Sequence, residues 1–129
     1  MKCSSVYETY PWGFQDDIPF LNQAVLMETG LDPFDFLHEI QEIERQLGRR
    51  RGSHRYSGRT IDIDIIFFGD RVIRDPVLEV PHPRMTERRF VLEPVHEICP
   101  EWMHSVLKVS VGVLLEKCED AISNPRRQS

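Results

Sequence analysis

The chain has 129 residues, of which 40% are apolar, and a formal net charge of -5 at pH 7. This length and apolar content suit one compact domain, and the net charge does not indicate a protein that coats DNA or a membrane surface. No apolar run approaches the ~20 residues of a membrane-spanning helix, and the N-terminus lacks a signal-peptide pattern. Cys3, Cys99 and Cys118 are widely spaced without zinc-binding spacing, so a reduced, cytoplasmic protein is expected.

The first half of the chain predicts two strands and one long helix. Residues 4–9 predict a short strand, and residues 18–29 predict a second strand after a loop rich in proline and acids. Apolar residues then recur at helical spacing over residues 32–48. Asp32 can cap this helix, and Gly48 is expected to end it.

The second half begins with an arginine-rich stretch, RRRGSHRYSGR, that predicts a mobile loop. The run TIDIDIIFF predicts a central strand, which a Gly69–Asp70 turn joins to a short hairpin partner, RVI. Residues 76–85 hold three prolines and predict an ordered irregular segment. A helix is expected after Thr86 as its cap, with a break or bend at Pro94.

Residues 110–121 predict a last helix, and residues 123–129 predict a frayed tail. There is no internal repeat and no linker. The sequence therefore predicts one α+β domain over residues 1–129.

Two aspartates interrupt the predicted central strand. Since alternate strand residues point to the same side, Asp62 and Asp64 should project together, opposite a core face made by three isoleucines, Ile61, Ile63 and Ile65. Their backbones would lie roughly 6–7 Å apart, so both carboxylates could hold one Mg²⁺ or bridge a pair. The alternative is a solvent-facing strand edge whose aspartates pair with Arg55 or Arg59.

Basic residues flank this strand on both sides. Six of the 13 arginines fall between residues 45 and 59, a span without an acid, and planar guanidinium groups suit phosphate binding. His82, Arg84 and Arg88 follow the strand and could close over the same phosphates. Asn22 is expected on an apolar strand face, where its amide either pairs with a flat heterocycle or is a satisfied structural group.

The run RYSGRTIDIDIIFFGD, followed by VPHPRMTERRFVLEPVHEICPEW, resembles the signature of the 6-hydroxymethyl-7,8-dihydropterin pyrophosphokinase family. SSVYET, PFLNQAV and IERQLGR occur in the order of that family, so the resemblance covers essentially residues 3–118. It implies a ferredoxin-like α+β fold with a mainly antiparallel sheet. It also implies transfer of pyrophosphate from MgATP to the hydroxymethyl group of the reduced pterin, with release of AMP, in folate biosynthesis.

The same resemblance implies a set of site residues. Asp62 and Asp64 are expected to hold two Mg²⁺ ions that bridge the ATP phosphates, and Arg49 and Arg59 are expected to act with them in catalysis. The further expected nucleotide contacts are Arg51, Gln41, Glu44, His82 and Arg88. The expected pterin contacts are Thr9, Trp12, Phe20, Asn22, Tyr56 and Phe90.

The implied partners are ATP and the pterin, with no nucleic acid and no membrane. Family members begin with a strand, a Gly-Ser-Asn-type turn and a helix ahead of the segment that starts here at Met1. We therefore expect self-association or poor solubility of this chain, and little turnover. Two other functions stay open: a non-catalytic nucleotide-binding remnant, and an arginine-loop module that binds RNA or another polyanion, although exposed aromatic pairs for base stacking are lacking.

Overall fold

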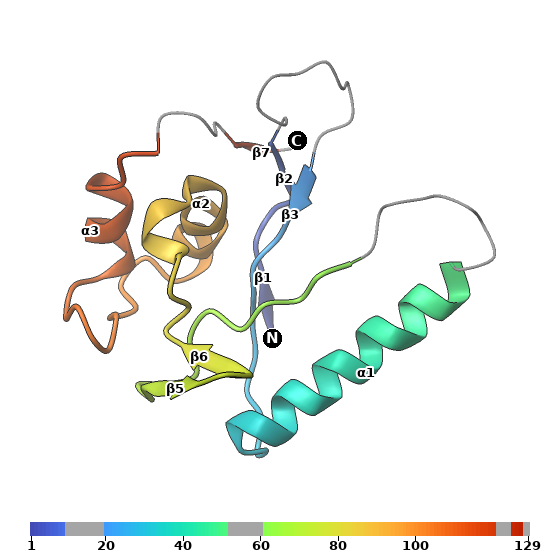
Figure 1. The fold of residues 1–129 in the computed structure, drawn as a ribbon. Coiled ribbons are helices and arrows are strands. Elements are labelled where there is room, and N and C mark those ends of the chain that lie inside the picture. The colour runs from blue at the N-terminus through green and yellow to red at the C-terminus, as the bar shows by residue number, and fades with distance from the viewer. Residues whose placement is uncertain (10–19, 52–60, 121–124, 128–129) are drawn as a thin grey trace.

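The computed structural model describes residues 1–9, 20–51, 61–120 and 125–127. Figure 1 shows α1 (Pro33–Arg51) on one side of a set of short strands, and α2 (Arg89–Ile98) and α3 (Val111–Glu116) together on the other side. All strand pairings are antiparallel among the described residues. The α+β class is therefore confirmed, and the structure is consistent with a ferredoxin-like fold.

The N-terminal strands form two small sheets. β1 (Lys2–Cys3) pairs with β4 (Val25–Leu26), and β2 (Tyr7–Thr9) lies between β3 (Phe20–Asn22) and β7 (Arg126–Arg127). The prediction of one strand over residues 18–29 was wrong, because β3 and β4 are separate. Between β3 and β4, the Oγ of Ser4 accepts from the N–H of Ala24 at 2.9 Å, and the carbonyl of Ser4 accepts from the Gln23 side chain at 2.7 Å.

Helix α1 begins as predicted and ends later than predicted. Asp32 Oδ1 accepts hydrogen bonds from the N–H groups of Phe34 at 2.8 Å and Asp35 at 3.1 Å, which confirms it as the cap. The helix continues through Gly48 to Arg51, so Gly48 is not its end. Gly48 does not adopt the positive φ that a glycine helix end uses, and the arginines that follow are good helix formers.

The predicted central strand was also wrong. Residues 61–68 belong to no strand, because no described segment pairs with them in a ladder of backbone hydrogen bonds. The turn that follows was right: Gly69 has a φ of 57°, and the N–H of Arg71 donates to the carbonyl of Phe68 at 3.0 Å. The expected partner RVI instead leads into β5 (Ile73–Asp75), which pairs with β6 (Leu78–Val80).

The remaining predictions are partly confirmed. Residues 76–85 are ordered, but they include β6 and the start of a 3₁₀ helix, η1 (Met85–Glu87). Thr86 lies inside η1 and does not cap α2, which begins at Arg89 and runs through Pro94. Helix α3 is shorter than expected, and Ser110 Oγ caps it by accepting from the N–H of Val113 at 3.2 Å.

Within the predicted tail, the structure describes residues 125–127. Arg126 and Arg127 pair with Glu8 and Tyr7 as strand β7, so the prediction was wrong for these two residues. Arg127 also forms a 3.8 Å ion pair with Glu97 on α2. No helix in the described part of the chain is long and apolar enough to cross a membrane.

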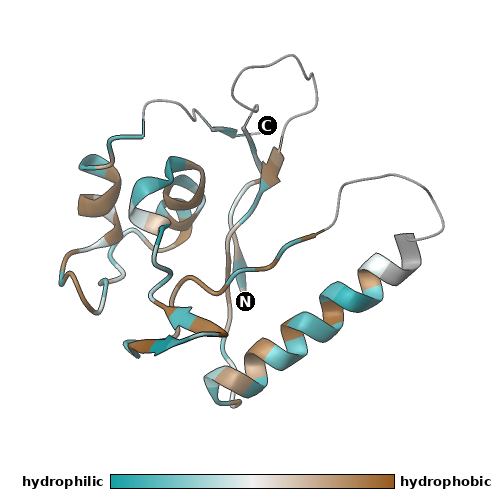
Figure 2. Cartoon of the chain, viewed as in Figure 1, coloured by the Kyte–Doolittle hydropathy of each residue, from teal (hydrophilic) through white to brown (hydrophobic). Residues whose placement is uncertain are grey.

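The core lies between η1, α2 and α3. Met85 and Leu92 are completely buried, and Leu114 and Cys118 pack with them. Ile66 and Phe67 pack against this cluster, so it anchors the end of the segment that carries the two aspartates. Figure 2 shows apolar residues recurring between polar ones along α1, which is typical of an amphipathic helix.

Candidate functional site

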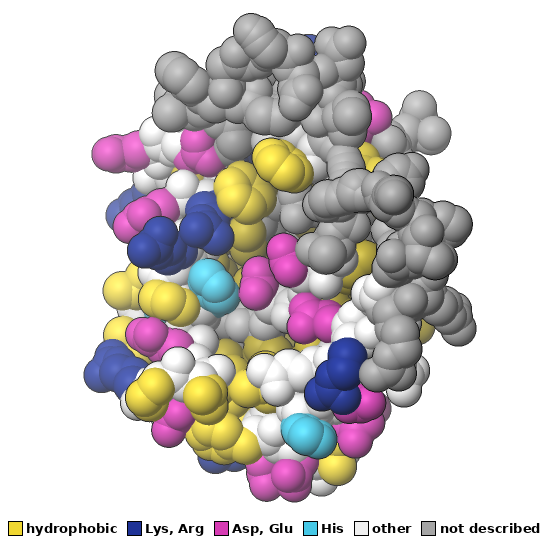
Figure 3. Space-filling model, turned by 45° about the vertical axis from the view of Figure 1, so that its right-hand side comes forward, with side chains coloured by type: hydrophobic (Ala, Val, Ile, Leu, Met, Phe, Trp, Pro, Cys, Tyr) yellow, Lys and Arg dark blue, Asp and Glu magenta, His cyan; other side chains and the backbone are white. Residues whose placement is uncertain are grey.

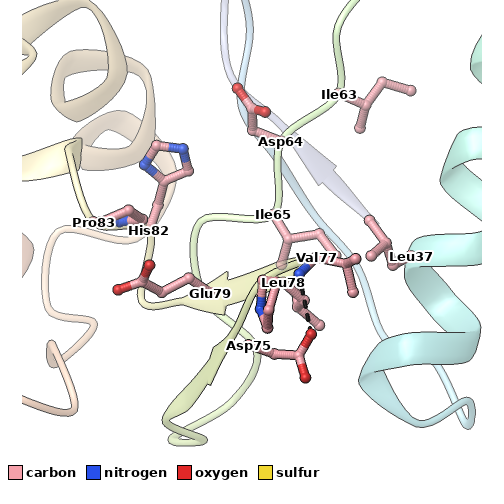
Figure 4. A pocket seen from close by; sticks show the side chains of 11 residues that line it. Leu37, Ile63, Asp64, Ile65, Asp75, Val77, Leu78, Glu79, His82 and Pro83 are labelled. Atoms are coloured by element: carbon pink, nitrogen blue, oxygen red, sulfur yellow. Dashed lines mark hydrogen bonds between the residues drawn. The ribbon is translucent and has the colours of Figure 1, made fainter.

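A cavity of about 250 Å³ lies between α1, residues 63–65 and the β5–β6 hairpin, and Figure 4 shows the side chains around it. Leu37, Ile65 and Leu78 contribute apolar walls, whereas Asp64 and His82 contribute polar groups. Pockets for drug-sized ligands measure roughly 300–1,000 Å³. At about 250 Å³ this cavity is too small to enclose a whole nucleotide.

His82 is held next to the aspartate segment by its backbone. Its N–H donates to the carbonyl of Ile66 at 2.8 Å, two residues after Asp64. Its ring accepts a hydrogen bond at Nδ1 from the N–H of Arg84, at 3.2 Å. With Nδ1 accepting, the proton of a neutral ring is on Nε2, so His82 can donate one hydrogen bond through that nitrogen.

The charge around His82 is mixed. Burial lowers the pKa of His82, Arg88 and Arg84 lower it further, and Asp64 and Glu79 oppose this shift. The ring is therefore neutral at pH 7. Figure 3 shows acidic side chains, basic side chains and a histidine gathered around the middle of one face of the molecule.

The two aspartates are exposed. Ile63, which lies between them, and Ile65, which follows Asp64, are half-buried. In Figure 4 Ile63 and Asp64 leave the chain on opposite sides, Ile63 toward α1. The predicted alternation is therefore present over residues 62–65, but Ile61 is 43% exposed and is not part of a core face. Extended backbone keeps this alternation even where no strand pairing exists.

Neither Asp62 nor Asp64 forms a hydrogen bond or an ion pair with the described residues. No three histidine, cysteine, aspartate or glutamate side chains gather as a metal site within the ranges that the structure describes. Two exposed carboxylates without a partner among the described residues fit Mg²⁺, which takes few protein ligands and completes its shell with water and phosphate. The alternative partners, Arg55 and Arg59, lie outside the described residues. The donor set therefore suits a metal that arrives with a nucleotide.

Helix α1 contributes to this site through Glu44. Its Oε2 accepts a 2.6 Å hydrogen bond from the N–H of Ile63, the residue between the two aspartates. Gln41 lies one turn earlier and is exposed. The backbones of Arg49 and Arg51 lie in the last turns of α1, and their side chains are outside the described part of the structure, as are Trp12, Tyr56 and Arg59.

A second group of predicted residues meets at the β2–β3 pair. Thr9 lies opposite Phe20, and Tyr7 lies opposite Asn22, so these four side chains share one face of the pair. Phe20 is 60% exposed and Asn22 is half-buried. Thr9 is 6% exposed, and its Oγ1 is buried without a hydrogen-bond partner. Such a hydroxyl indicates an acceptor or donor that is not part of the described protein.

Helix α2 lies between the two groups. It contacts β2 and β3, and its first turn carries Phe90, which is half-buried. The guanidinium of Arg88 lies 5.7 Å from the centre of the Phe90 ring, and its charge acts on His82. Arg88 therefore connects the aspartate–histidine group with the β2–β3 group.

Other residues of the site were missed by sequence reasoning. The cavity walls Leu37 and Leu78 are far apart in the chain, and no local signal identifies them. Arg89, which the sequence did not single out, is a structural residue, because its side chain donates to the carbonyls of Asp120 at 3.4 Å and Cys118 at 3.1 Å.

Comparisons with known proteins give consistent matches. The sequence model of the 7,8-dihydro-6-hydroxymethylpterin-pyrophosphokinase family matches residues 1–100. A 2-amino-4-hydroxy-6-hydroxymethyldihydropteridine pyrophosphokinase of Bacillus subtilis is 50% identical over 100 residues, 78% of this chain and 59% of the relative. A protein of the same name from Porphyromonas gingivalis is 45% identical over 107 residues, 81% of this chain and 72% of the relative.

The folic acid synthesis protein fol1 of Pneumocystis carinii is 38% identical over 120 residues, 93% of this chain and 16% of the relative. This chain thus spans 59% of the Bacillus subtilis relative and a much smaller part of the fungal one.

Proposed function

Since the chain belongs to the 7,8-dihydro-6-hydroxymethylpterin-pyrophosphokinase family, we propose that it transfers pyrophosphate from MgATP to 6-hydroxymethyl-7,8-dihydropterin and releases AMP in folate biosynthesis. The observation that carries this proposal is that Asp64 and His82 line the same cavity, together with the apolar residues Leu37 and Leu78. A metal-binding carboxylate, a hydrogen-bond donor and a place for a flat base are the parts that a bound nucleotide requires.

For the nucleotide, we propose that Asp62 and Asp64 hold two Mg²⁺ ions against the phosphates. Bound there, the ions would neutralise charge on the transferred group. His82 donates from Nε2 to a phosphate oxygen, and Arg88 adds a positive charge from the start of α2. The base enters the cavity between Leu37 and Leu78. Gln41, Glu44, Arg49, Arg51 and Arg59 complete the proposed nucleotide contacts.

For the pterin, we propose the face shared by β2 and β3. The unpartnered Oγ1 of Thr9 and the amide of Asn22 offer hydrogen bonds to a ring edge, and Phe20 and Phe90 offer apolar surfaces for its faces. Trp12 and Tyr56 stay predictions for the same ring.

The reaction needs orientation more than a protein nucleophile. The hydroxymethyl oxygen attacks the β-phosphorus of ATP, the bond between that phosphorus and the oxygen bridging to the α-phosphorus breaks, and AMP leaves. The hydroxyl proton passes to solvent. Residues that hold both substrates in line and neutralise phosphate charge are sufficient for this step.

We also propose a cytoplasmic location and self-association. All three cysteines are free, which is typical of a reducing compartment. Leu21, Val25 and Met27 are exposed on β3, on β4 and directly after β4. Each is between 49% and 58% exposed, so a second copy of the chain could cover them. Sedimentation at several protein concentrations tests this, and a monomer at every concentration would contradict it.

The activity is tested by incubating the chain with ATP, Mg²⁺ and the reduced pterin and measuring AMP. We expect AMP only with the pterin, and its loss in Asp62→Ala and in Asp64→Ala. Asp70→Ala is the matched control, because Asp70 is an exposed aspartate in the turn after this segment. Mg²⁺-dependent ATP binding without AMP would instead identify a remnant, and salt-sensitive RNA binding that ignores both substitutions would identify a polyanion-binding module.

A further inference from the structure

The hydrogen bond from Ile63 to Glu44 joins two elements that are distant in sequence. The donor is a backbone N–H in the segment between the aspartates, and the acceptor is a side chain on α1, 19 residues earlier. At 2.6 Å it is short for an N–H donor, and a carboxylate is a strong acceptor. The bond therefore fixes the backbone of Ile63 and not only the side chain of Glu44.

The segment depends on such a contact because it pairs with no strand in the part of the chain that the structure describes. Its C-terminal end is anchored: the carbonyl of Ile66 accepts from His82, and the Phe67 ring stacks on Trp102 at 5.9 Å. Phe68 also packs edge-on against Phe36 of α1 at 5.9 Å. Toward its N-terminal end, among the described residues, the Glu44 carboxylate is the hydrogen-bonding partner of the backbone.

Apolar packing supports the same geometry. Ile63 is half-buried and lines the cavity together with Leu37 of α1, on the side opposite Asp64. The backbone N–H of Ile63 is thus held by α1, and its side chain lies on the side of the segment that faces this helix. With the residue between them fixed, Asp62 and Asp64 keep their direction and separation.

We propose that Glu44 is a positioning residue for metal binding, which acts through the Ile63 backbone and does not touch the metal itself. The inference rests on the proposed function of Asp62 and Asp64 as Mg²⁺ ligands. Residues that hold a ligand in place commonly change metal affinity by about 10–100-fold when they are replaced.

The test compares three variants of the full chain. Glu44→Ala removes the acceptor, Glu44→Gln keeps a neutral acceptor of the same size, and Glu42→Gln is the matched control because Glu42 pairs with Arg45 on the same helix. The first readout is hydrogen exchange of the Ile63 amide in ¹⁵N-labelled protein. The second is the Mg²⁺ concentration at half-saturation for binding a non-hydrolysable ATP analogue.

We expect the Ile63 amide to exchange at least about tenfold faster in Glu44→Ala, and the half-saturating Mg²⁺ concentration to rise about 10–100-fold. Glu44→Gln should lie between wild type and Glu44→Ala, and Glu42→Gln should match wild type. Unchanged exchange in Glu44→Ala, or weaker nucleotide binding at saturating Mg²⁺ with unchanged Mg²⁺ dependence, would overturn the proposal. If Glu44→Ala does not fold, Glu44→Gln decides by the same two readouts.

The readouts separate this inference from the proposed activity. In one outcome, wild-type protein makes no AMP but binds the nucleotide in an Mg²⁺-dependent way, while Glu44→Ala needs more Mg²⁺ for this binding and exchanges the Ile63 amide faster. The positioning role then stands and the catalytic proposal fails. If AMP is made and Glu44→Ala changes neither readout, the activity stands and the positioning role fails.

Discussion

The hydroxyl of Tyr7 on β2 donates a 2.8 Å hydrogen bond to Glu97 on α2. The same carboxylate accepts from the N–H of Ser5, at 3.0 and 3.1 Å to its two oxygens, and from the Ser5 hydroxyl at 3.0 Å. Arg127 of β7 forms an ion pair with it at 3.8 Å. One side chain thus holds the strand that carries Thr9 against the helix that carries Phe90.

Tyr7→Phe tests this connection. We expect the free energy of unfolding to fall by about 1 kcal/mol, because the hydrogen bond is lost from a side chain that is 4% exposed. Urea unfolding followed by circular dichroism measures the change. An unchanged midpoint and slope would show that the Tyr7 hydroxyl does not stabilise the β2–α2 contact.

Thr9→Val tests the unpartnered hydroxyl. Valine has nearly the same shape, and the buried Oγ1 of Thr9 has no partner to lose, so stability should stay the same or rise by about 1 kcal/mol. The KM for the pterin should rise, because the proposed hydrogen bond to the ring is removed.

The control for this pair of readouts is Thr29→Val, since Thr29 Oγ1 accepts from the N–H of Leu31 at 3.1 Å on the surface. It should leave the KM for the pterin unchanged. A KM that is equally unchanged in Thr9→Val would remove Thr9 from the proposed pterin site.

Adjacent arginines should behave differently. Arg89→Ala should lower the free energy of unfolding by about 1–2 kcal/mol, because its guanidinium binds two carbonyls after α3. Arg88→Ala should leave stability nearly unchanged and raise the KM for ATP, because Arg88 faces His82 and Phe90. Thermal unfolding and steady-state AMP formation measure the two effects, and a reversed pattern would contradict the assignment.

Stability should depend on pH through two histidines. Burial lowers the pKa of both His104 and His82 from the ordinary value of 6.5. As the pH falls below about 6.5, the unfolded chain therefore binds more protons than the folded chain. The stabilising contribution of the two histidines is complete above about pH 6.5 and is lost as the pH falls toward their lower pKa in the folded protein. Denaturant unfolding midpoints at pH 7.5, 6.5 and 5.5 should decrease in that order.

His104→Gln should make this dependence shallower, although it lowers stability at every pH because Nδ1 of His104 accepts from Val106 at 3.2 Å and Leu107 at 3.0 Å. His38→Gln is the control, because His38 is exposed on α1. A pH dependence as steep in His104→Gln as in His38→Gln would show that His104 does not cause it.

Local sequence patterns predicted the features that depend on neighbours in the chain. The cap at Asp32 and the turn at Gly69 each need only a few adjacent residues, and each is present. Predictions failed where a partner far along the chain decides the result. β3 and β4 are separated at Gln23 and Ala24, which form hydrogen bonds to Ser4, and Arg126 and Arg127 near the end of the chain pair with β2.

In the candidate site, too, some features depend on neighbours in the chain and others on distant partners. The sequence by itself determined that Asp62 and Asp64 point away from Ile63, because extended backbone alternates its side chains whether or not it is paired. It also carried the family signature that the comparisons confirm. Only the tertiary structure decided that residues 61–68 join no described strand, that α1 holds Ile63 through Glu44, and that His82 lies beside Asp64. Side-chain direction is a property of the local backbone, whereas hydrogen-bond partners across the fold depend on how distant segments pack.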